Sequence, residues 1–149
     1  MRILIQRVIS ANVVVDGSVT GAIDHGLLLL VGVTHADTES TEDRMADKIV
    51  KLRIFSDEKG LMNRSVLDVG GGLLAVSQFT LYADAKNGNR PSYTNAARPD
   101  QASPAFDRLV AKLALRLGKS VPTGVFGADM KVTLVNDGPV TIWLDSDAP

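Results

Sequence analysis

The sequence predicts one α+β domain, in which two main helices flank a largely antiparallel sheet that curls toward a barrel. Three observations lead to this prediction. Short apolar or alternating segments typical of strands recur along the chain, two segments change to the helical period, and the order is strands, helix, strands, helix, strands. The chain has 149 residues without a repeat or a linker, so we assign residues 1–149 to a single domain.

The first strands are indicated by alternation and by one turn. Residues 2–8 alternate in part between apolar and polar side chains, and Asp16-Gly17 between β-branched segments is typical of a two-residue hairpin turn. Residues 26–33, GLLLLVGV, are almost wholly apolar, which predicts a strand buried on both faces. Later strands are expected over residues 73–82, 131–135 and 140–144.

Two segments have the period of an amphipathic helix. The first covers residues 38–52. It offers three hydroxyl side chains as caps: Thr38, Ser40 and Thr41. In the second, Ser103 is expected as the N-cap and Pro104 as the first helical residue, and Gly118 ends the helix.

Composition excludes several classes of protein. Without Cys there is neither a disulfide nor thiolate chemistry, and the longest apolar run, residues 27–33, is too short to span a membrane. The segment MRILIQRVIS lacks the features of a signal peptide, so we expect a cytoplasmic protein. A net charge of −1 argues against binding duplex nucleic acid through the overall field, and it leaves room for a local basic patch.

The usual catalytic motifs are missing. The two histidines, His25 and His35, lack the spacing of a metal-binding helix, and there is no GxSxG elbow, P-loop or dinucleotide-binding glycine motif after a strand. We therefore expect neither a metal nor another cofactor. Gly70-Gly71-Gly72 is interpreted as a flexible turn.

Two polar segments remain as candidate sites. Ser77–Leu81, SQFTL, ends an apolar strand, where hydroxyls and backbone N–H groups are held rigidly. It precedes a long loop, residues 83–101, with three cationic side chains, and loops of this length are often functional. The second is Asn136–Thr141, NDGPVT. On pattern alone, the first is equally a strand with solvent-facing polar residues, and the second a tight turn between two strands.

Several segments together resemble the D-aminoacyl-tRNA deacylase family over nearly the whole chain. They are QRV at 6–8, GLLLLVGV at 26–33, LRIFSDEKGLMN at 52–63, SQFTL at 77–81, NRPSY at 89–93, TGVFGADM at 123–130 and NDGPVT at 136–141. Leu61 departs from the Lys that is common in relatives, at an expected surface position. The DGPVT form favours the branch that proofreads chirality over the related animal deacylase that clears L-alanine.

The resemblance implies a homodimer whose substrate is the 3′ end of aminoacyl-tRNA, with no membrane or DNA partner. Each active site would release a D-amino acid, or glycine, from the terminal adenosine. The pocket of one subunit would be lined by Ser77, Gln78, Phe79 and Thr80. The other subunit would contribute Gly138 and Pro139, joined by a cis peptide, whose carbonyls meet the substrate amine and exclude an L side chain. Arg7 would pack near that turn, and Met130 would shape the adenosine side.

The chemistry of the hydrolysis has two interpretations. The resemblance favours assistance by the 2′-hydroxyl of the terminal ribose, with backbone N–H groups near Phe79 stabilising the oxyanion. In the other, Ser77 or Thr80 is a nucleophile, although the sequence places no base beside either. A non-catalytic nucleic-acid-binding or interaction module on the same fold is the alternative of a different class.

We expect the deacylase activity to be independent of metal ions, because the two histidines are isolated and there is no Cys. Exhaustive chelation should leave the hydrolysis rate unchanged. A loss of rate that added Zn²⁺ restores would show a metal site that the sequence does not indicate.

Overall fold

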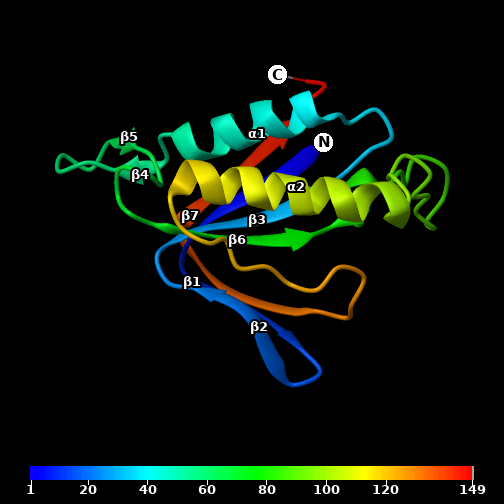
Figure 1. The fold of residues 1–149 in the computed structure, drawn as a ribbon, viewed down its shortest axis with the longest axis horizontal. Helices are drawn as coiled ribbons and strands as arrows, with labels where there is room; N and C mark the ends of the chain where they lie inside the picture. Colours follow the sequence, from blue (N-terminus) through cyan, green and yellow to red (C-terminus); the bar gives the residue numbers. More distant parts are fainter. Residues whose placement is uncertain (149) are drawn as a thin grey trace.

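Five strands pair into one curled sheet, and two helices cover one of its faces (Figure 1). The computed structural model describes residues 1–148. The strands of the sheet are β1 (Arg2–Val15), β2 (Ser18–Ile23), β3 (Gly26–Gly32), β6 (Gly72–Ser77) and β7 (Lys131–Asp145). The helices are α1 (Glu39–Lys51), the 3-10 turn η1 (Phe79–Tyr82) and α2 (Pro99–Leu117), and a small separate hairpin joins β4 (Phe55–Ser56) to β5 (Met62–Arg64).

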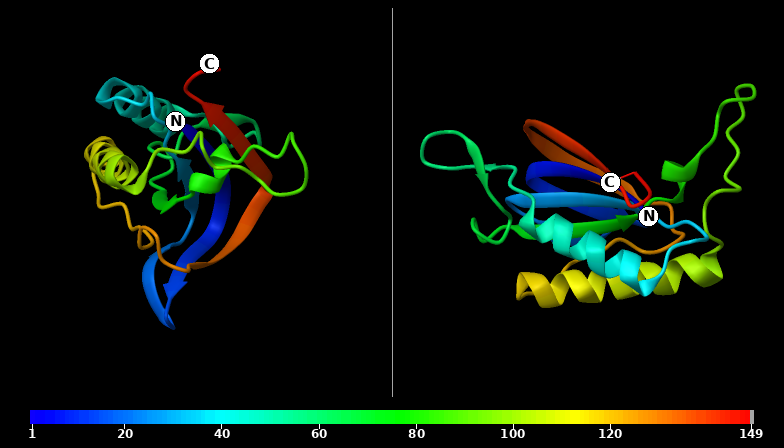
Figure 2. Two further views of the ribbon diagram at one scale, coloured as in Figure 1. Left: turned by 90° about the vertical axis from the view of Figure 1, so that its right-hand side faces the viewer. Right: turned by 90° about the horizontal axis from the view of Figure 1, so that it is seen from above.

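The sheet is mixed rather than purely antiparallel. β1 pairs antiparallel with β2, β3 and β7, whereas β3 and β6 are parallel. A parallel pair needs a long crossover, and α1 lies in the segment that connects β3 to β6. The α+β class, the two flanking helices and the largely antiparallel, curled sheet are thus confirmed, and Figure 2 shows the curl from the side.

β3 is buried on both faces, as its apolar sequence predicts. Leu27 and Leu29 belong to the core between the sheet and the two helices. Leu28 belongs to a second core enclosed by the curl of the sheet, together with Val8 and Val76. The strand alternates between these two cores because successive side chains point to opposite faces.

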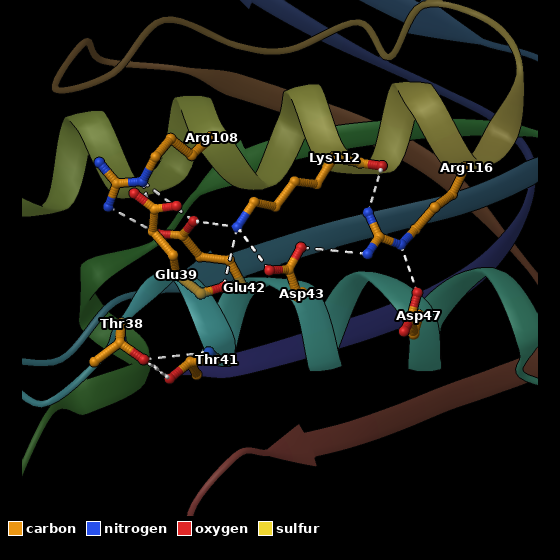
Figure 3. Close-up of polar contacts among 9 residues, drawn as sticks. All are labelled: Thr38, Glu39, Thr41, Glu42, Asp43, Asp47, Arg108, Lys112 and Arg116. Carbon is orange, nitrogen blue, oxygen red and sulfur yellow. Dashed lines mark hydrogen bonds and ion pairs between the residues drawn. The ribbon is translucent and has the colours of Figure 1, made fainter.

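The expected hairpin and first helix are confirmed. Asp16 and Gly17 both have positive φ, 49° and 78°, between β1 and β2. Thr38 caps α1: its hydroxyl accepts a hydrogen bond from the Thr41 N–H at 3.4 Å, and the Thr41 hydroxyl accepts one from the Thr38 N–H at 3.1 Å (Figure 3).

The predicted start of the second helix is wrong. α2 begins at Pro99 with Arg98 as N-cap, so Ser103 and Pro104 lie inside it. Pro99 suits the first helical position because its φ is fixed. Pro104 removes one backbone hydrogen bond, and the burial of Ala102 and its neighbours Ala105 and Phe106 offsets that loss. Gly118 ends the helix in the left-handed region, as expected.

Two strand boundaries also differ from the prediction. The first strand extends to Val15 because its second half pairs with both β2 and β7. The strand expected over residues 73–82 ends at Ser77, and the chain turns into η1. No helix in residues 1–148 is both long enough and apolar enough to cross a membrane.

α1 and α2 run side by side and are joined by ion pairs (Figure 3). The buried Glu42 carboxylate accepts hydrogen bonds from Arg108 Nη2 at 2.8 Å and forms an ion pair with Lys112 Nζ at 3.1 Å. Arg116 donates to Asp47, and this hydrogen bond lowers the pKa of the Asp47 carboxyl. The pairs fix the register of the two helices over the first core.

The core between helices and sheet should dominate stability. Leu109 of α2 is fully buried, whereas Leu115 of the same helix is 82% exposed. Leu109→Ala should reduce the free energy of unfolding by about 2–5 kcal/mol through lost burial and a cavity. Leu115→Ala should change it by less than about 0.5 kcal/mol. Urea unfolding of both variants measures the contrast, and similar losses would contradict the assigned packing.

Candidate active site

A cavity of about 570 Å³ lies between the carboxyl end of β6 and the amino-terminal turns of α2. Three of the expected pocket residues line it, Ser77, Gln78 and Phe79, and so does Met130. Thr80 is not among the lining residues; its hydroxyl accepts a hydrogen bond from the Gln78 side chain. The structure thus brings four of the expected residues to one cavity, and Thr80 is joined to one of them, Gln78, by a hydrogen bond.

The SQFTL segment forms its part of the cavity by leaving the sheet. The Gln78 N–H donates to the Val31 carbonyl at 2.7 Å, which fixes the point of departure. Phe79 then begins η1 and is 55% exposed. The first N–H groups of a helical turn have no partner within it, so the backbone at Phe79 and Thr80 is suited to hydrogen bonding a ligand oxygen.

Met130 has a fixed place because Gly124 leaves room for it. A Cβ on Gly124 would overlap the Met130 sulfur and lie 3.3 Å from Val13 Cγ1. Met130 also packs on the second core of the sheet. The thioether therefore forms an apolar wall of the cavity, which suits a flat aromatic group.

Ion pairing and burial near Arg2 hold η1 in place. Arg2 Nη1 donates to the Leu81 carbonyl at 3.0 Å, Nε donates to Asp145 at 3.0 Å, and the guanidinium lies 4.5 Å from the centre of the Tyr82 ring. Burial, with nearby carboxylates, raises the pKa of the Tyr82 hydroxyl, so it stays protonated. Burial opposes ionisation of Asp145, but hydrogen bonds from Asp147 N–H and Arg2 outweigh it and lower the Asp145 pKa.

A second group of expected residues lies in β7. Gln6 pairs with Thr141 and Val8 with Asn136, so residues 137–140 stand opposite Arg7 alone. This four-residue bulge replaces the expected tight turn between two strands. That expectation is wrong because β7 resumes its pairing with β1 on the far side of the bulge.

The bulge has defined internal geometry. Asn136 Oδ1 accepts the Val140 N–H at 3.2 Å, and Asn136 Nδ2 donates to Thr141 Oγ1 at 3.0 Å. Gly138 has a φ of +126°, a value that favours glycine, and the Gly138–Pro139 peptide is cis. Both residues are exposed.

Arg7 connects the bulge to the rest of the protein. Its Nε donates to the Asp137 carbonyl at 3.2 Å, and its Nη1 donates to the Ile54 carbonyl at 2.8 Å. The Asp137 carboxylate is 3.4 Å from the Arg7 Nε, and the arginine side chain is only 12% exposed. The expected packing of Arg7 near the turn is therefore present.

The structure keeps the two groups apart within one chain. Neither Gly138 nor Pro139 lines the cavity that contains Ser77 and Met130. Sequence reasoning assigned no role to several other lining residues: Tyr93, Arg98, Phe106 and Phe126. Tyr93 and Phe126 lie in NRPSY and TGVFGADM, two of the segments that carry the family resemblance, so the sequence did point to their surroundings. Phe106 has only the helical spacing of a core residue.

Each histidine makes a contact that holds it within the fold. His25 packs edge-on against Phe55 at 5.2 Å between ring centres, and His35 Nε2 is hydrogen bonded to the Thr94 carbonyl at 2.8 Å. Within residues 1–148, no group of three or more His, Cys, Asp or Glu side chains is arranged to hold a metal ion.

The chain resembles known proteins over its full length. The family described as D-Tyr-tRNA(Tyr) deacylase matches residues 4–145. A protein of Dechloromonas aromatica named D-aminoacyl-tRNA deacylase is 60% identical over 149 residues, which cover 100% of this chain and 99% of that one.

Solved structures also share the fold. One, described as c-Myc DNA Unwinding Element Binding Protein, has a TM-score of 0.91 and 38% identity, covering 97% of this chain and 98% of that one. Another, described as a probable eukaryotic D-amino acid tRNA deacylase, has a TM-score of 0.81 over 96% of this chain and 97% of its own. Its identity of 14% shows a shared fold alone.

Arg7→Lys should loosen the bulge. The guanidinium donates from Nε to the Asp137 carbonyl and from Nη1 to the Ile54 carbonyl, and the single ammonium of lysine cannot reproduce this spacing. We expect the Val140 amide to exchange with solvent about tenfold faster, since a local opening that is about 1.4 kcal/mol easier changes its equilibrium tenfold. Arg64→Lys, in an exposed pair with Glu58, is the matched control. Unchanged exchange at Val140 would show that Arg7 does not hold the bulge.

Proposed function

Because the chain belongs to the D-Tyr-tRNA(Tyr) deacylase family and is thus a D-aminoacyl-tRNA deacylase, we propose that it hydrolyses the ester between a D-amino acid, or glycine, and the 3′-terminal adenosine of cytoplasmic tRNA. The cavity at the end of β6 supports this proposal most directly. It combines backbone donors at Phe79 with the apolar Met130 wall, and so offers an oxyanion site beside a surface for a base.

We propose that selection of the D hand requires a second subunit. In this scheme the Gly138–Pro139 bulge enters the pocket of the partner and places carbonyl oxygens against the substrate α-amino group. A rigid backbone opposite Cα then rejects an L side chain by collision. Affinity alone would discriminate poorly, since one methylene group contributes only about 1–3 kcal/mol. Exposure of the bulge and its attachment through Arg7 support this role.

The homodimer that this scheme needs has support from the outer face of β7. Val135 is 50% exposed and Trp143 is 48% exposed, and both flank the bulge in sequence. A contiguous exposed apolar patch marks an interface between chains, and we propose that these two side chains belong to such a patch. A second copy covering β7 would bury them and bring the bulge to a neighbouring pocket.

The proposed chemistry uses the substrate's own 2′-hydroxyl. A water molecule attacks the ester carbonyl carbon, the bond to the ribose 3′-oxygen breaks, and the proton from water passes to that oxygen with help from the 2′-hydroxyl. The protein positions the ester and stabilises the oxyanion through N–H groups at Phe79. Ser77 and Thr80 are less suited as nucleophiles. The Thr80 hydroxyl accepts a hydrogen bond from Gln78, and within residues 1–148 no hydrogen bond joins either hydroxyl to a His, Asp or Glu side chain that could act as a base.

A second candidate function is DNA binding, since one solved structure that is 38% identical to this chain is described as a DNA-binding protein. Binding of a DNA duplex at physiological salt, unaffected by D-aminoacyl-tRNA, would favour it. If D-aminoacyl-tRNA instead displaces the DNA, both bind the same cavity, and the result favours the deacylase function alone.

The 2′-hydroxyl mechanism predicts that removing the 2′-oxygen of the terminal ribose greatly slows hydrolysis. A tRNA that ends in 2′-deoxyadenosine and carries D-Tyr on its 3′-oxygen should be hydrolysed at least about 100-fold more slowly, the contribution of a positioned proton-transfer group. Ser77→Ala and Thr80→Ala, tested singly on ordinary substrate, should each cost less than about tenfold. Equal hydrolysis of the deoxy substrate would contradict the mechanism.

Mixed dimers test the proposed contribution of the partner. Phe79→Glu should weaken the pocket by repelling RNA, and Gly138→Val should disrupt the bulge, because an added Cβ would lie 2.9 Å from Val140 Cγ2. Each altered homodimer should be impaired. A mixed dimer has one doubly altered and one intact site, so about half of the normal activity should return.

The alternative gives a different result. If the bulge serves its own subunit, each site of the mixed dimer carries one defect and activity stays as low as in the parents. Differently tagged subunits allow the mixed species to be isolated, and an intact dimer with both tags is the control.

A further inference from the structure

The segment 83–98 joins η1 to α2 and projects beyond the end of the sheet, where Figures 1 and 2 show it as a green loop. Two backbone hydrogen bonds between Asp84 and Ser92, each 2.8 Å long, close it into a hairpin. The Asp84 carboxylate accepts the backbone N–H of Lys86 at 2.9 Å. Every residue from 85 to 95 is exposed, and these residues form an arm that extends from the body of the protein.

The base of the arm is attached firmly to the body. Thr34 Oγ1 donates to the Asn95 carbonyl at 2.6 Å, and His35 Nε2 is hydrogen bonded to the Thr94 carbonyl at 2.8 Å. These contacts fix the base of the arm beside the cavity. A ligand held in the cavity therefore meets the side chains of the arm where it leaves the cavity.

Positive charge is concentrated on this segment. The segment 83–98 contains three cationic residues, Lys86, Arg90 and Arg98, against one acidic residue, Asp84, whereas the whole chain has a net charge of −1. All three side chains are exposed, and none forms an ion pair within residues 1–148. Cations that no carboxylate neutralises are available to an external polyanion.

The arm is continuous with the cavity. Tyr93 of the arm and Arg98 both line it. The Tyr93 ring meets the Phe79 ring edge-on, with 5.1 Å between centres, and the two residues are 40% and 55% exposed. Exposed aromatic rings beside cations are typical of surfaces that bind single-stranded nucleic acid through base stacking and phosphate contacts.

We propose that the arm binds the acceptor strand of tRNA on the 5′ side of the terminal adenosine. Lys86, Arg90 and Arg98 contact its phosphates, and Phe79 and Tyr93 present their rings to the preceding base. The inference rests on the proposed function: if the cavity takes the terminal adenosine, the strand attached to it must cross this rim. RNA then supplies one negative charge per nucleotide to these cations, which form no ion pair within residues 1–148.

The test compares two substrates of one enzyme. For the double variant Lys86→Ala with Arg90→Ala, KM for D-Tyr-tRNA should rise about tenfold with kcat unchanged, and the log–log dependence of kcat/KM on salt should become shallower by about 1.4–1.8. Hydrolysis of the minimal substrate, adenosine esterified with D-Tyr, should not change. Lys48→Ala with Lys51→Ala is the control, because it removes the same charge from exposed positions of α1.

Three results would overturn the proposal. They are an unchanged KM for D-Tyr-tRNA, an equal loss on both substrates, and an effect of the control as large as that of the arm variant. If the unaltered enzyme hydrolyses neither substrate, the proposed function itself fails and this inference fails with it.

Discussion

The antiparallel pairing of β1 with β7 is the constraint on which the rest of the structure depends. It extends from Arg2 opposite Asp145 to Val14 opposite Lys131, so the strands at the two ends of the chain lie side by side. Because the pairing resumes after residues 137–140, these residues must leave the sheet as a bulge. Arg7 stands opposite them and satisfies the Asp137 carbonyl that the sheet no longer pairs.

This constraint divides the proposed active site between two supports. The cavity depends on the end of β6, on η1 and on α2, which rest on the core beneath the helices. The bulge depends on β1 and on the Ile54 carbonyl beside Arg7. Neither support brings its residues to the other in one chain, because Gly138 and Pro139 do not line the cavity. A pairing of two chains is the simplest way in which both could act on one substrate, and it requires no movement within either.

Local features were predictable from the sequence, and features that depend on distant partners were not. The Asp16-Gly17 turn and the Thr38 cap follow from neighbouring residues. The continuity of β7 depends on β1, more than a hundred residues earlier, and NDGPVT by itself resembles an ordinary turn. Tyr93 and Phe126 reach the cavity only through the folded arrangement. The resemblance to a family grouped the remaining site residues, whose roles stay proposals.

Chiral selection is tested most directly by following release of the amino acid from D-Tyr-tRNA and L-Tyr-tRNA in single turnovers, with the enzyme in excess. The proposed bulge in the partner's pocket predicts fast release of D-Tyr and release of L-Tyr no faster than without enzyme. The difference should exceed about 100-fold, more than a single methylene contact supplies. Comparable release of both would contradict rejection by a backbone wall, although it would leave the hydrolytic activity itself in place.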